Sequence, residues 1–130
     1  MENLNRVNNC PFCDTKIQND LIFGNETAFV IFDRFPVSKG HALIISKRHC
    51  ASFFDLTSNE QNDCFSLIFK MKKEIQNKYN PDGFNIGINI GKSAGQTIFH
   101  VHIHLIPRYI GDVENPTGGV RAVIPSKKMY

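Results

Sequence analysis

Three histidines alternate with apolar residues in the run His100-Val101-His102-Ile103-His104. Successive side chains of a β-strand point to opposite faces, so one face is expected to carry the histidines. The other face is expected to carry Phe99, Val101, Ile103 and Leu105. Imidazole titrates near neutral pH and can serve as nucleophile, general acid or base, or metal ligand. The run therefore predicts a strand with chemistry on one face and hydrophobic core on the other.

One hypothesis is a single zinc ion bound by all three histidines, with an open position that activates water. Alternate residues lie roughly 6.5–7 Å apart along a strand, which separates His100 from His104 by roughly 13 Å. This separation disfavours one ion shared by the whole row. A second hypothesis divides the row, so that one histidine joins a structural metal site and another acts on a substrate.

Cys10 and Cys13 form a C-x-x-C pair near the start of the chain. Such pairs occur in zinc sites and in thioredoxin-like redox centres. A redox centre would need a following βαβ unit, but residues 20–24 and 27–32 read instead as two short strands. The pattern therefore favours a metal site. A Cys₂His₂ set, a common set of structural zinc ligands, is available in Cys10, Cys13, His49 and His100.

Several further elements are expected around the histidine strand. Residues 41–46 read as an apolar strand. The segment from Thr57 to Glu60 has the form of a capping box, and it predicts an amphipathic helix that ends near Tyr79. Residues 84–90 alternate like a strand and lead into the small-residue loop 91–97, whose backbone N–H groups can approach an anion closely. The apolar stripe of the helix is Cys64, Ile68, Met71 and Ile75, with Phe65 and Phe69 beside them.

The chain has 130 residues, of which 42% are hydrophobic and 21% charged, which predicts one globular domain. Residues 1–9 are expected to be loose, and residues 111–130 to form an extension that packs in part through Val120, Val123 and Ile124. A net charge of +3 is too weak to indicate a nucleic-acid groove. Because no apolar span or signal peptide is evident, we expect a soluble, cytoplasmic protein with four cysteines as thiols or metal ligands.

The run from Gly95 to Arg108 resembles the signature of the histidine-triad (HIT) superfamily, and residues 35–45 resemble the second motif of that family. Together with residues 83–85 and the cysteine pair, the resemblance covers most of residues 10–110. It implies an α+β fold with a five-stranded antiparallel sheet, one long helix and one or more short helices. It also implies a homodimer whose sheets join.

The resemblance further implies a nucleotide hydrolase that attacks the α-phosphate and passes through a nucleotidyl-histidine. His102 matches the nucleophile, and His104 and His41 match residues that support the site and handle the leaving group. Asp33 matches the carboxylate that binds the ribose hydroxyls. The positions that match contacts near the α-phosphate are Asn89, Gly95, Gln96 and Thr97. In family members with the cysteine pair, structural zinc is bound at the positions of Cys10, Cys13, His49 and His100.

Within the family, Gln96-Thr97 and Pro107-Arg108 followed by Gly111-Asp112 look most like the fragile-histidine-triad and dinucleoside polyphosphate hydrolase branches. The expected substrates are therefore dinucleoside polyphosphates, such as diadenosine tetraphosphate, or other AMP conjugates. Three alternatives stay open: an adenosine phosphoramidase, a nucleotide-binding regulatory module with little turnover, and a hydrolase with catalytic zinc. Residues 115–121 are expected on the leaving-group side. Three apolar residues either contact the base or belong to the core: Phe12, Ile31 and Phe32.

Overall fold

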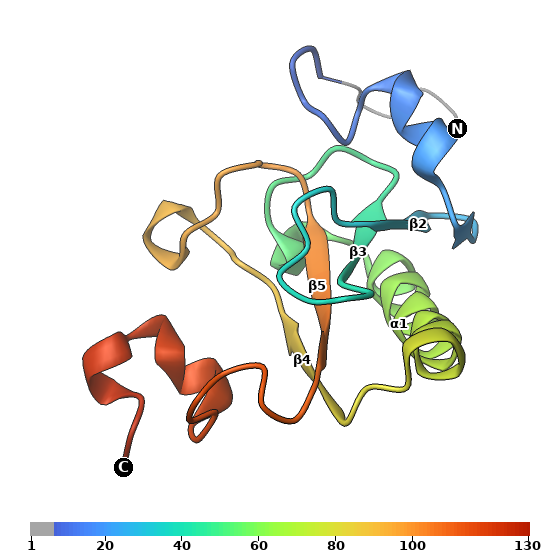
Figure 1. Ribbon diagram of the computed structural model, residues 1–130. Coiled ribbons are helices and arrows are strands. Elements are labelled where there is room, and N and C mark those ends of the chain that lie inside the picture. Colours follow the sequence, from blue (N-terminus) through green and yellow to red (C-terminus); the bar gives the residue numbers. More distant parts are fainter. Residues whose placement is uncertain (1–6) are drawn as a thin grey trace.

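The computed structural model describes residues 7–130 and contains a five-stranded antiparallel sheet with the strand order β1-β2-β3-β5-β4 (Figure 1). The strands are β1 (Phe23–Gly24), β2 (Ala28–Phe32), β3 (Ala42–Ser46), β4 (Gly83–Gly87) and β5 (His102–Arg108). The long helix is α1 (Ser58–Tyr79). The short 3₁₀ helices are η1 (Thr15–Asp20), η2 (Phe53–Asp55), η3 (Lys92–Ala94), η4 (Gly119–Val123) and η5 (Pro125–Lys127). The α+β architecture expected from the sequence is confirmed.

Helix α1 begins at the predicted capping box. The Glu60 N–H donates to Thr57 Oγ1 over 3.1 Å, and Glu60 Oε1 accepts from the Thr57 N–H over 2.9 Å. Asn80 ends the helix in the left-handed conformation, with φ of 51°. The predicted apolar stripe faces the sheet. It lies in one core cluster with Val101, which precedes β5, and with Ile103 and Leu105 of β5. Phe65 and Phe69 are exposed. The helix therefore covers one face of the sheet (Figure 1).

The opposite face of the sheet carries a second apolar cluster. Phe29, Ile31, Leu43 and Ile45 of β2 and β3 pack there against Cys10, Phe12, Cys13 and Ile17 of the N-terminal segment. His102 and His104 emerge on this face, because they alternate along β5 with the helix-facing Ile103 and Leu105. Ile45 of β3 pairs with His102, and Leu43 pairs with His104. The side chains of His102 and His104 therefore lie on the face of the sheet opposite to α1.

Three strand predictions need correction at their ends. Residues 20–24 form only the two-residue β1, because η1 occupies the chain up to Asp20. Strand β4 stops at Gly87 and not at residue 90, and Gly87 pairs with His104. Strand β5 begins at His102, so Phe99 and His100 precede the ladder. For this reason Phe99 is 48% exposed and does not join the core, contrary to the expected alternation.

Residues 111–130 fold mainly on themselves and contact the sheet at β4 (Figure 1). Arg121 donates to the carbonyl oxygens of Lys127 and Lys128, which holds η4 and η5 together. The apolar side chains expected to pack there do not: Val120, Val123 and Ile124 are 65%, 76% and 56% exposed. Within residues 7–130, the extension contacts the sheet mainly at β4, so these three side chains have no apolar partner surface that covers them.

The predicted loose terminus lies mostly outside the described residues, at positions 1–6, while residues 7–9 are exposed. Over residues 7–130, no helix combines the length and hydropathy that are needed to cross a bilayer.

Candidate functional site

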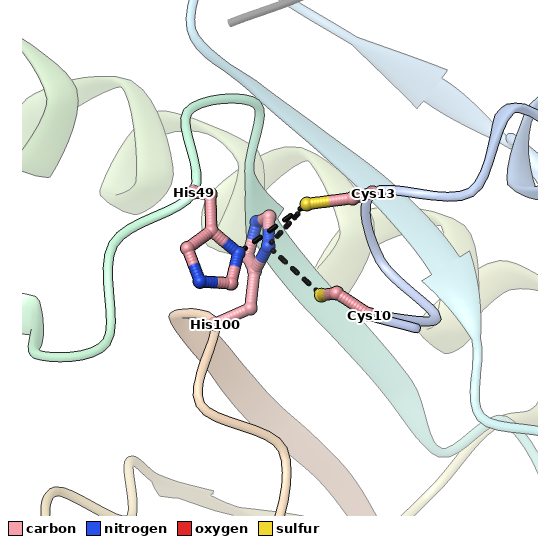
Figure 2. A group of neighbouring side chains, drawn as sticks. All are labelled: Cys10, Cys13, His49 and His100. Atoms are coloured by element: carbon pink, nitrogen blue, oxygen red, sulfur yellow. Dashed lines mark hydrogen bonds between the residues drawn. The ribbon is translucent and has the colours of Figure 1, made fainter. Parts of the chain in front are cut away.

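Four side chains from three parts of the chain converge at one end of the sheet (Figure 2). Cys10 and Cys13 come from the N-terminal segment, His49 follows β3, and His100 precedes β5. Their ligand atoms all lie within 4.8 Å of one another. Cys10 Sγ lies 3.5 Å from His100 Nδ1, and Cys13 Sγ lies 3.3 Å from His49 Nδ1 and 3.6 Å from His100 Nδ1. The structure therefore brings together all four residues that the sequence analysis assigned to a metal site.

These distances fit a tetrahedral metal ion. With Zn–S of about 2.3 Å and Zn–N of about 2.1 Å, neighbouring ligand atoms would lie roughly 3.6 Å apart. The tautomer of His100 also fits, because its Nε2 lies 2.6 Å from the carbonyl oxygen of Ser46 and must donate to it. The lone pair is then on Nδ1, which faces the two sulfur atoms. The donor set, its spacing and the orientation of His100 all suit zinc.

His102 is held in a different tautomer. Its Nδ1 lies 2.8 Å from the carbonyl oxygen of His100 and donates its proton there. The lone pair is therefore on Nε2, and the imidazole lines the cleft described below. A neutral imidazole with an available Nε2 is a competent nucleophile. One backbone carbonyl next to the metal cluster thus determines which nitrogen of His102 can react.

His104, His41 and Asp33 form a second cluster beside His102. The N–H of Val37 donates to His41 Nδ1 over 3.1 Å, so the proton of neutral His41 is on Nε2. His41 Nε2 lies 3.0 Å from His104 Nδ1 and 3.5 Å from Asp33 Oδ2. His104 consequently accepts at Nδ1 and carries its own proton on Nε2. The cluster presents an N–H donor beside the nucleophile.

Both supporting histidines stay neutral at pH 7. Burial lowers the pKa of His41, and Asp33 opposes this effect only in part. Burial, followed by the neighbouring His102 and His41, lowers the pKa of His104 to about 4. The directed hydrogen bonds between neutral rings are therefore preserved under physiological conditions.

The same tautomers argue against a catalytic metal ion in the second cluster. A metal at His41 Nε2 would move the proton of the ring to Nδ1, where it would face the N–H of Val37. Two donors would then oppose each other, and the hydrogen bond to His104 would be lost. In the first cluster, the Nδ1 lone pair of His100 faces the thiols and is available to a metal ion. In the second cluster, His104 instead presents an Nε2–H donor.

A cleft of about 500 Å³ opens over His102 and His104, within the usual range for small-ligand sites. Asp33, Asn89, Gly95 and Thr97 line it together with these two histidines, so six of the predicted catalytic and substrate-binding residues meet in one place. His41 lies behind His104 and is buried. Of the three apolar candidates, Phe12 and Ile31 line the cleft, whereas Phe32 is exposed elsewhere.

Gln96 takes a different place from its neighbours in the loop 91–97. It is buried, and its side chain amide donates to the carbonyl oxygens of Ala51 and Ile98. Its Oε1 accepts from the N–H of Gly91 over 2.9 Å. These contacts occupy both ends of the amide and close the loop. The side chain of Gln96 therefore braces the backbone that places Gly95, with φ of 93°, and Thr97 at the cleft.

The sequence analysis missed two cations at the cleft, Lys16 of η1 and Arg34 after β2. Arg34 forms an ion pair with Asp20 over 2.8 Å, which links the two sides of the cleft entrance. Nothing in spacing or periodicity distinguishes these residues from surface cations. Their closeness in sequence to Cys13 and Asp33 was the only signal that pointed to them.

Comparisons with known proteins agree on one family. Residues 14–111 match the model of the HIT domain. The chain is 38% identical over 98 residues to the bis(5'-adenosyl)-triphosphatase of Dictyostelium discoideum. The matched residues cover 75% of this chain and 66% of that protein. A crystal structure of a HIT family protein from Bacillus anthracis matches with a TM-score of 0.73 and 39% identity, over 81% of this chain and 77% of that chain.

A second solved structure is the Zn-bound histidine triad family protein of Mycobacterium smegmatis, with a TM-score of 0.72 and 31% identity. The match covers 82% of this chain and 80% of that one. The segment that matches the family model contains all five histidines and every strand of the sheet. Sequence and fold thus lead to one assignment, and this chain belongs to the HIT family.

Proposed function

We propose that this protein is a nucleotidyl hydrolase that cleaves nucleoside phosphate conjugates at the α-phosphate through a nucleotidyl-His102 intermediate. The observation that carries the proposal is the hydrogen bond from His102 Nδ1 to the carbonyl oxygen of His100, because it leaves the Nε2 lone pair as the nucleophile. Family membership supports the reaction class, and the name of the D. discoideum relative describes a hydrolase of a dinucleoside polyphosphate.

In the first step, a bond forms between His102 Nε2 and the α-phosphorus, and the P–O bond to the leaving group breaks. The imidazole becomes positively charged, and its Nδ1–H bond to the carbonyl oxygen of His100 stabilises that charge. The Nε2–H of His104 balances charge on the phosphoryl or leaving-group oxygen, and His41 and Asp33 hold this ring in the required tautomer. Splitting the displacement into two steps lowers the barrier of each.

In the second step, water attacks the phosphorus, the N–P bond breaks, and one proton of the water passes to solvent. His102 returns to its resting tautomer with the proton still on Nδ1. The nucleoside monophosphate then leaves the cleft. Lys16, which lines the cleft, can attract a phosphate group of the substrate, and Asp33 can accept hydrogen bonds from ribose hydroxyls in addition to the one from the N–H of Phe35.

We further propose that the ion bound by Cys10, Cys13, His49 and His100 is structural zinc. When bound, it would supply no chemistry beyond fixing its four ligands, and the backbone of His100 would in turn aim His102. The support is the complete ligand set with His100 Nδ1 turned toward the thiols, and the Zn-bound relative from M. smegmatis.

The test of the reaction is a substrate panel of diadenosine triphosphate, diadenosine tetraphosphate and adenosine phosphoramidate. We expect AMP release from the dinucleoside polyphosphates, an acid-labile adenylyl adduct on the protein, and loss of both in His102→Ala. The expected loss of kcat is on the order of 10⁴-fold. Ile106→Ala is the matched control, because Ile106 lies on the same face of β5 but does not line the cleft.

The panel separates the alternatives. Fast cleavage of adenosine phosphoramidate alone would assign the protein to the phosphoramidases. Tight AMP binding with no turnover of any compound would indicate a regulatory module. Turnover that is abolished by chelation even at saturating substrate, while the circular dichroism spectrum is unchanged, would favour catalytic zinc. Full activity in His102→Ala would overturn the proposed mechanism.

We also propose a homodimer in the cytoplasm. Strand β4 lies at the edge of the sheet with Ile86 51% exposed, and an edge strand can pair with a second copy. The four cysteines, all among residues 7–130, are not joined in disulfides, which suits a reducing compartment. Light scattering at several protein concentrations tests the dimer, and a mass of about 14.8 kDa would exclude it.

A further inference from the structure

The N-terminal segment from Cys10 to Ile17 belongs to two sites at once. Cys10 and Cys13 contribute the two sulfur atoms of the metal cluster. Between and after them, five residues line the cleft: Pro11, Phe12, Asp14, Lys16 and Ile17. One wall of the cleft is therefore made of the same short piece of chain that supplies half of the metal ligands.

Phe12 connects these two sites directly. Its ring is 6% exposed and lies edge-on to the imidazole of His102, with centroids 5.1 Å apart and an interplanar angle of 61°. It also lies edge-on to His100, at 5.8 Å and 85°. One aromatic ring thus contacts both a metal ligand and the proposed nucleophile, in the geometry that aromatic pairs prefer.

The segment is tied to the sheet by few directional contacts. Among the described residues, the backbone hydrogen bonds of residues 10–17 are local: the N–H groups of Cys10, Cys13 and Ile17 donate to the carbonyl oxygens of Val7, Cys10 and Asp14, respectively. What remains is apolar packing and the contacts of the two thiols with His49 and His100. A bound ion would convert those contacts into four bonds and fix the segment on the sheet.

We propose that metal binding at Cys10 and Cys13 sets the position of Phe12 against His102, and thereby completes the wall of the cleft. Phe12 is a positioning residue in this scheme. Metal and nucleotide then bind with positive coupling, and each strengthens the binding of the other by the same factor. This consequence rests on the proposed function, whereas the placement of Phe12 by the metal does not.

The metal-free protein is expected to keep its sheet and α1. The core cluster between α1 and the sheet contains no residue of the N-terminal segment, so it persists when that segment loosens. The coupling is therefore local and can be measured in a folded protein. Chelation should be carried out with a reductant present, so that Cys10 and Cys13 do not form a disulfide.

The experiment measures the Kd of AMP by calorimetry for zinc-loaded and metal-free protein. In the wild type, we expect removal of the metal to weaken AMP binding about tenfold or more. In Phe12→Ala, which keeps all four ligands, AMP binding should be weak and should change less than about twofold with metal. Phe35→Ala is the matched control: Phe35 lines the cleft but lies outside the segment, so AMP should bind more weakly while the dependence on metal stays as in the wild type.

A second measurement needs no nucleotide. The carbon-bound ring protons of His102 should show a ring-current shift from Phe12 in proton NMR of the loaded wild type. The shift should be lost both on chelation and in Phe12→Ala, but not in Phe35→Ala. The His102 signals are identified by their absence from His102→Gln.

The outcomes separate the two proposals. If AMP fails to bind the loaded wild type, the proposed function fails, and the His102 signals still decide the role of Phe12. Equal AMP affinity with and without metal, or unchanged His102 signals, overturns the placement of Phe12 by the metal. Unfolding of the metal-free protein in circular dichroism also overturns it, since the coupling would then be global.

Discussion

His104 has its proton position fixed by the hydrogen bond with His41, and its charge is set by burial. Its pKa is lowered to about 4, first by burial and then by His102 and His41, against a value of 6.5 for the ordinary side chain. This single residue therefore links the hydrogen-bond geometry of the site to the acid stability of the protein.

Between pH 6.5 and 4, the unfolded chain binds a proton at His104 and the folded protein does not. The free energy of unfolding is therefore expected to decrease as the pH falls through this range, by up to about 3 kcal/mol from this group. Urea unfolding at pH 7, 6, 5 and 4.5 measures the effect. His104→Asn should show a shallower pH dependence than the wild type, and equal slopes would contradict the assignment.

At the residue scale, sequence reasoning predicted most of the residues that the structure brings together at the candidate site, because the expected chemistry requires rare residue types. All five histidines and the cysteine pair fall where they were expected to cluster. The spacing could not show that His100 and His104 carry their ring proton on Nε2 while His102 carries it on Nδ1, since this depends on the carbonyl oxygens of Ser46 and His100 and on the tautomer of His41. Lys16 and Arg34 were missed because a cation on the surface carries no periodic signal.

At the element scale, the end of α1 and the turn before β3 depend on each other through Gly40. This residue has φ of 89°, and a Cβ there would lie 2.9 Å from Cδ2 of Tyr79 and 3.3 Å from Cγ2 of Ile75. Gly40 immediately precedes His41, so the close approach of the turn to the helix also positions that ring.

Gly40→Ala is expected to destabilise the protein by about 2–3 kcal/mol, because it combines a left-handed backbone with a steric clash. Thermal and urea unfolding measure the loss. Gly83→Ala is the control, since Gly83 has no heavy atom within 4 Å of an added Cβ and its backbone is not in the left-handed region. Equal effects of the two substitutions would show that the contact with Tyr79 is unimportant.

The first turn of α1 is joined to the residue before His49 by an ion pair. Arg48 donates to both carboxylate oxygens of Glu60, over 2.8 and 3.0 Å, and Glu60 is largely buried. These bonds, with those from Thr57, lower the pKa of Glu60 to about 2 even though burial acts in the opposite direction. The pair connects the start of the helix to the loop that carries a metal ligand.

Glu60→Gln should lower the free energy of unfolding at pH 7 by about 2 kcal/mol, between the values for exposed and buried pairs. The pKa of Glu60 is lowered, so its stabilisation is complete above the unfolded pKa of 4.5 and is lost as the pH falls to about 2. The variant should lack this acid-dependent loss. Glu74→Gln, an exposed position on the same helix, should change neither quantity.

The start of helix α1 after Thr57 and its end near Tyr79 could both be predicted, because the capping box and the apolar stripe are local signals. The ends of β4 and β5 could not, because alternation reports side-chain burial and not the partner strand. The alternation continues past Gly87, but Gly87 already pairs with His104, close to the start of β5 at His102. The bounds of a strand are set by its neighbour, and that information lies far away in the sequence.

At the scale of the whole molecule, one sheet separates two apolar cores, and only one of them contains residues of the proposed metal site. One is formed by α1 and is independent of the N-terminal segment. The other contains both cysteines of the C-x-x-C pair. That residues 1–130 form one domain stays a prediction, whereas the sheet, the helix and the two clusters are features of the structure.

Chelation of the metal should lower Tm by on the order of 10 °C and leave the far-ultraviolet circular dichroism at 25 °C unchanged, because only the second core loosens. Cys10→Ser should have a similarly low Tm that chelator does not lower further. Cys50→Ser is the control, since its thiol donates to Ser52 and lies outside the cluster. A Tm that does not respond to chelator in the wild type would exclude a structural metal.

The hydrogen bonds that join main-chain groups to the rings of His41, His100 and His102 have a consequence for how such a protein can evolve. A carbonyl oxygen is present whatever side chain its residue carries, and an amide proton is missing only in proline. Val37, with its exposed side chain, can thus be exchanged for almost any amino acid while its N–H still sets the tautomer of His41. A position whose side chain varies freely among related sequences can therefore still set the tautomer of a site histidine, because its main-chain group stays in place.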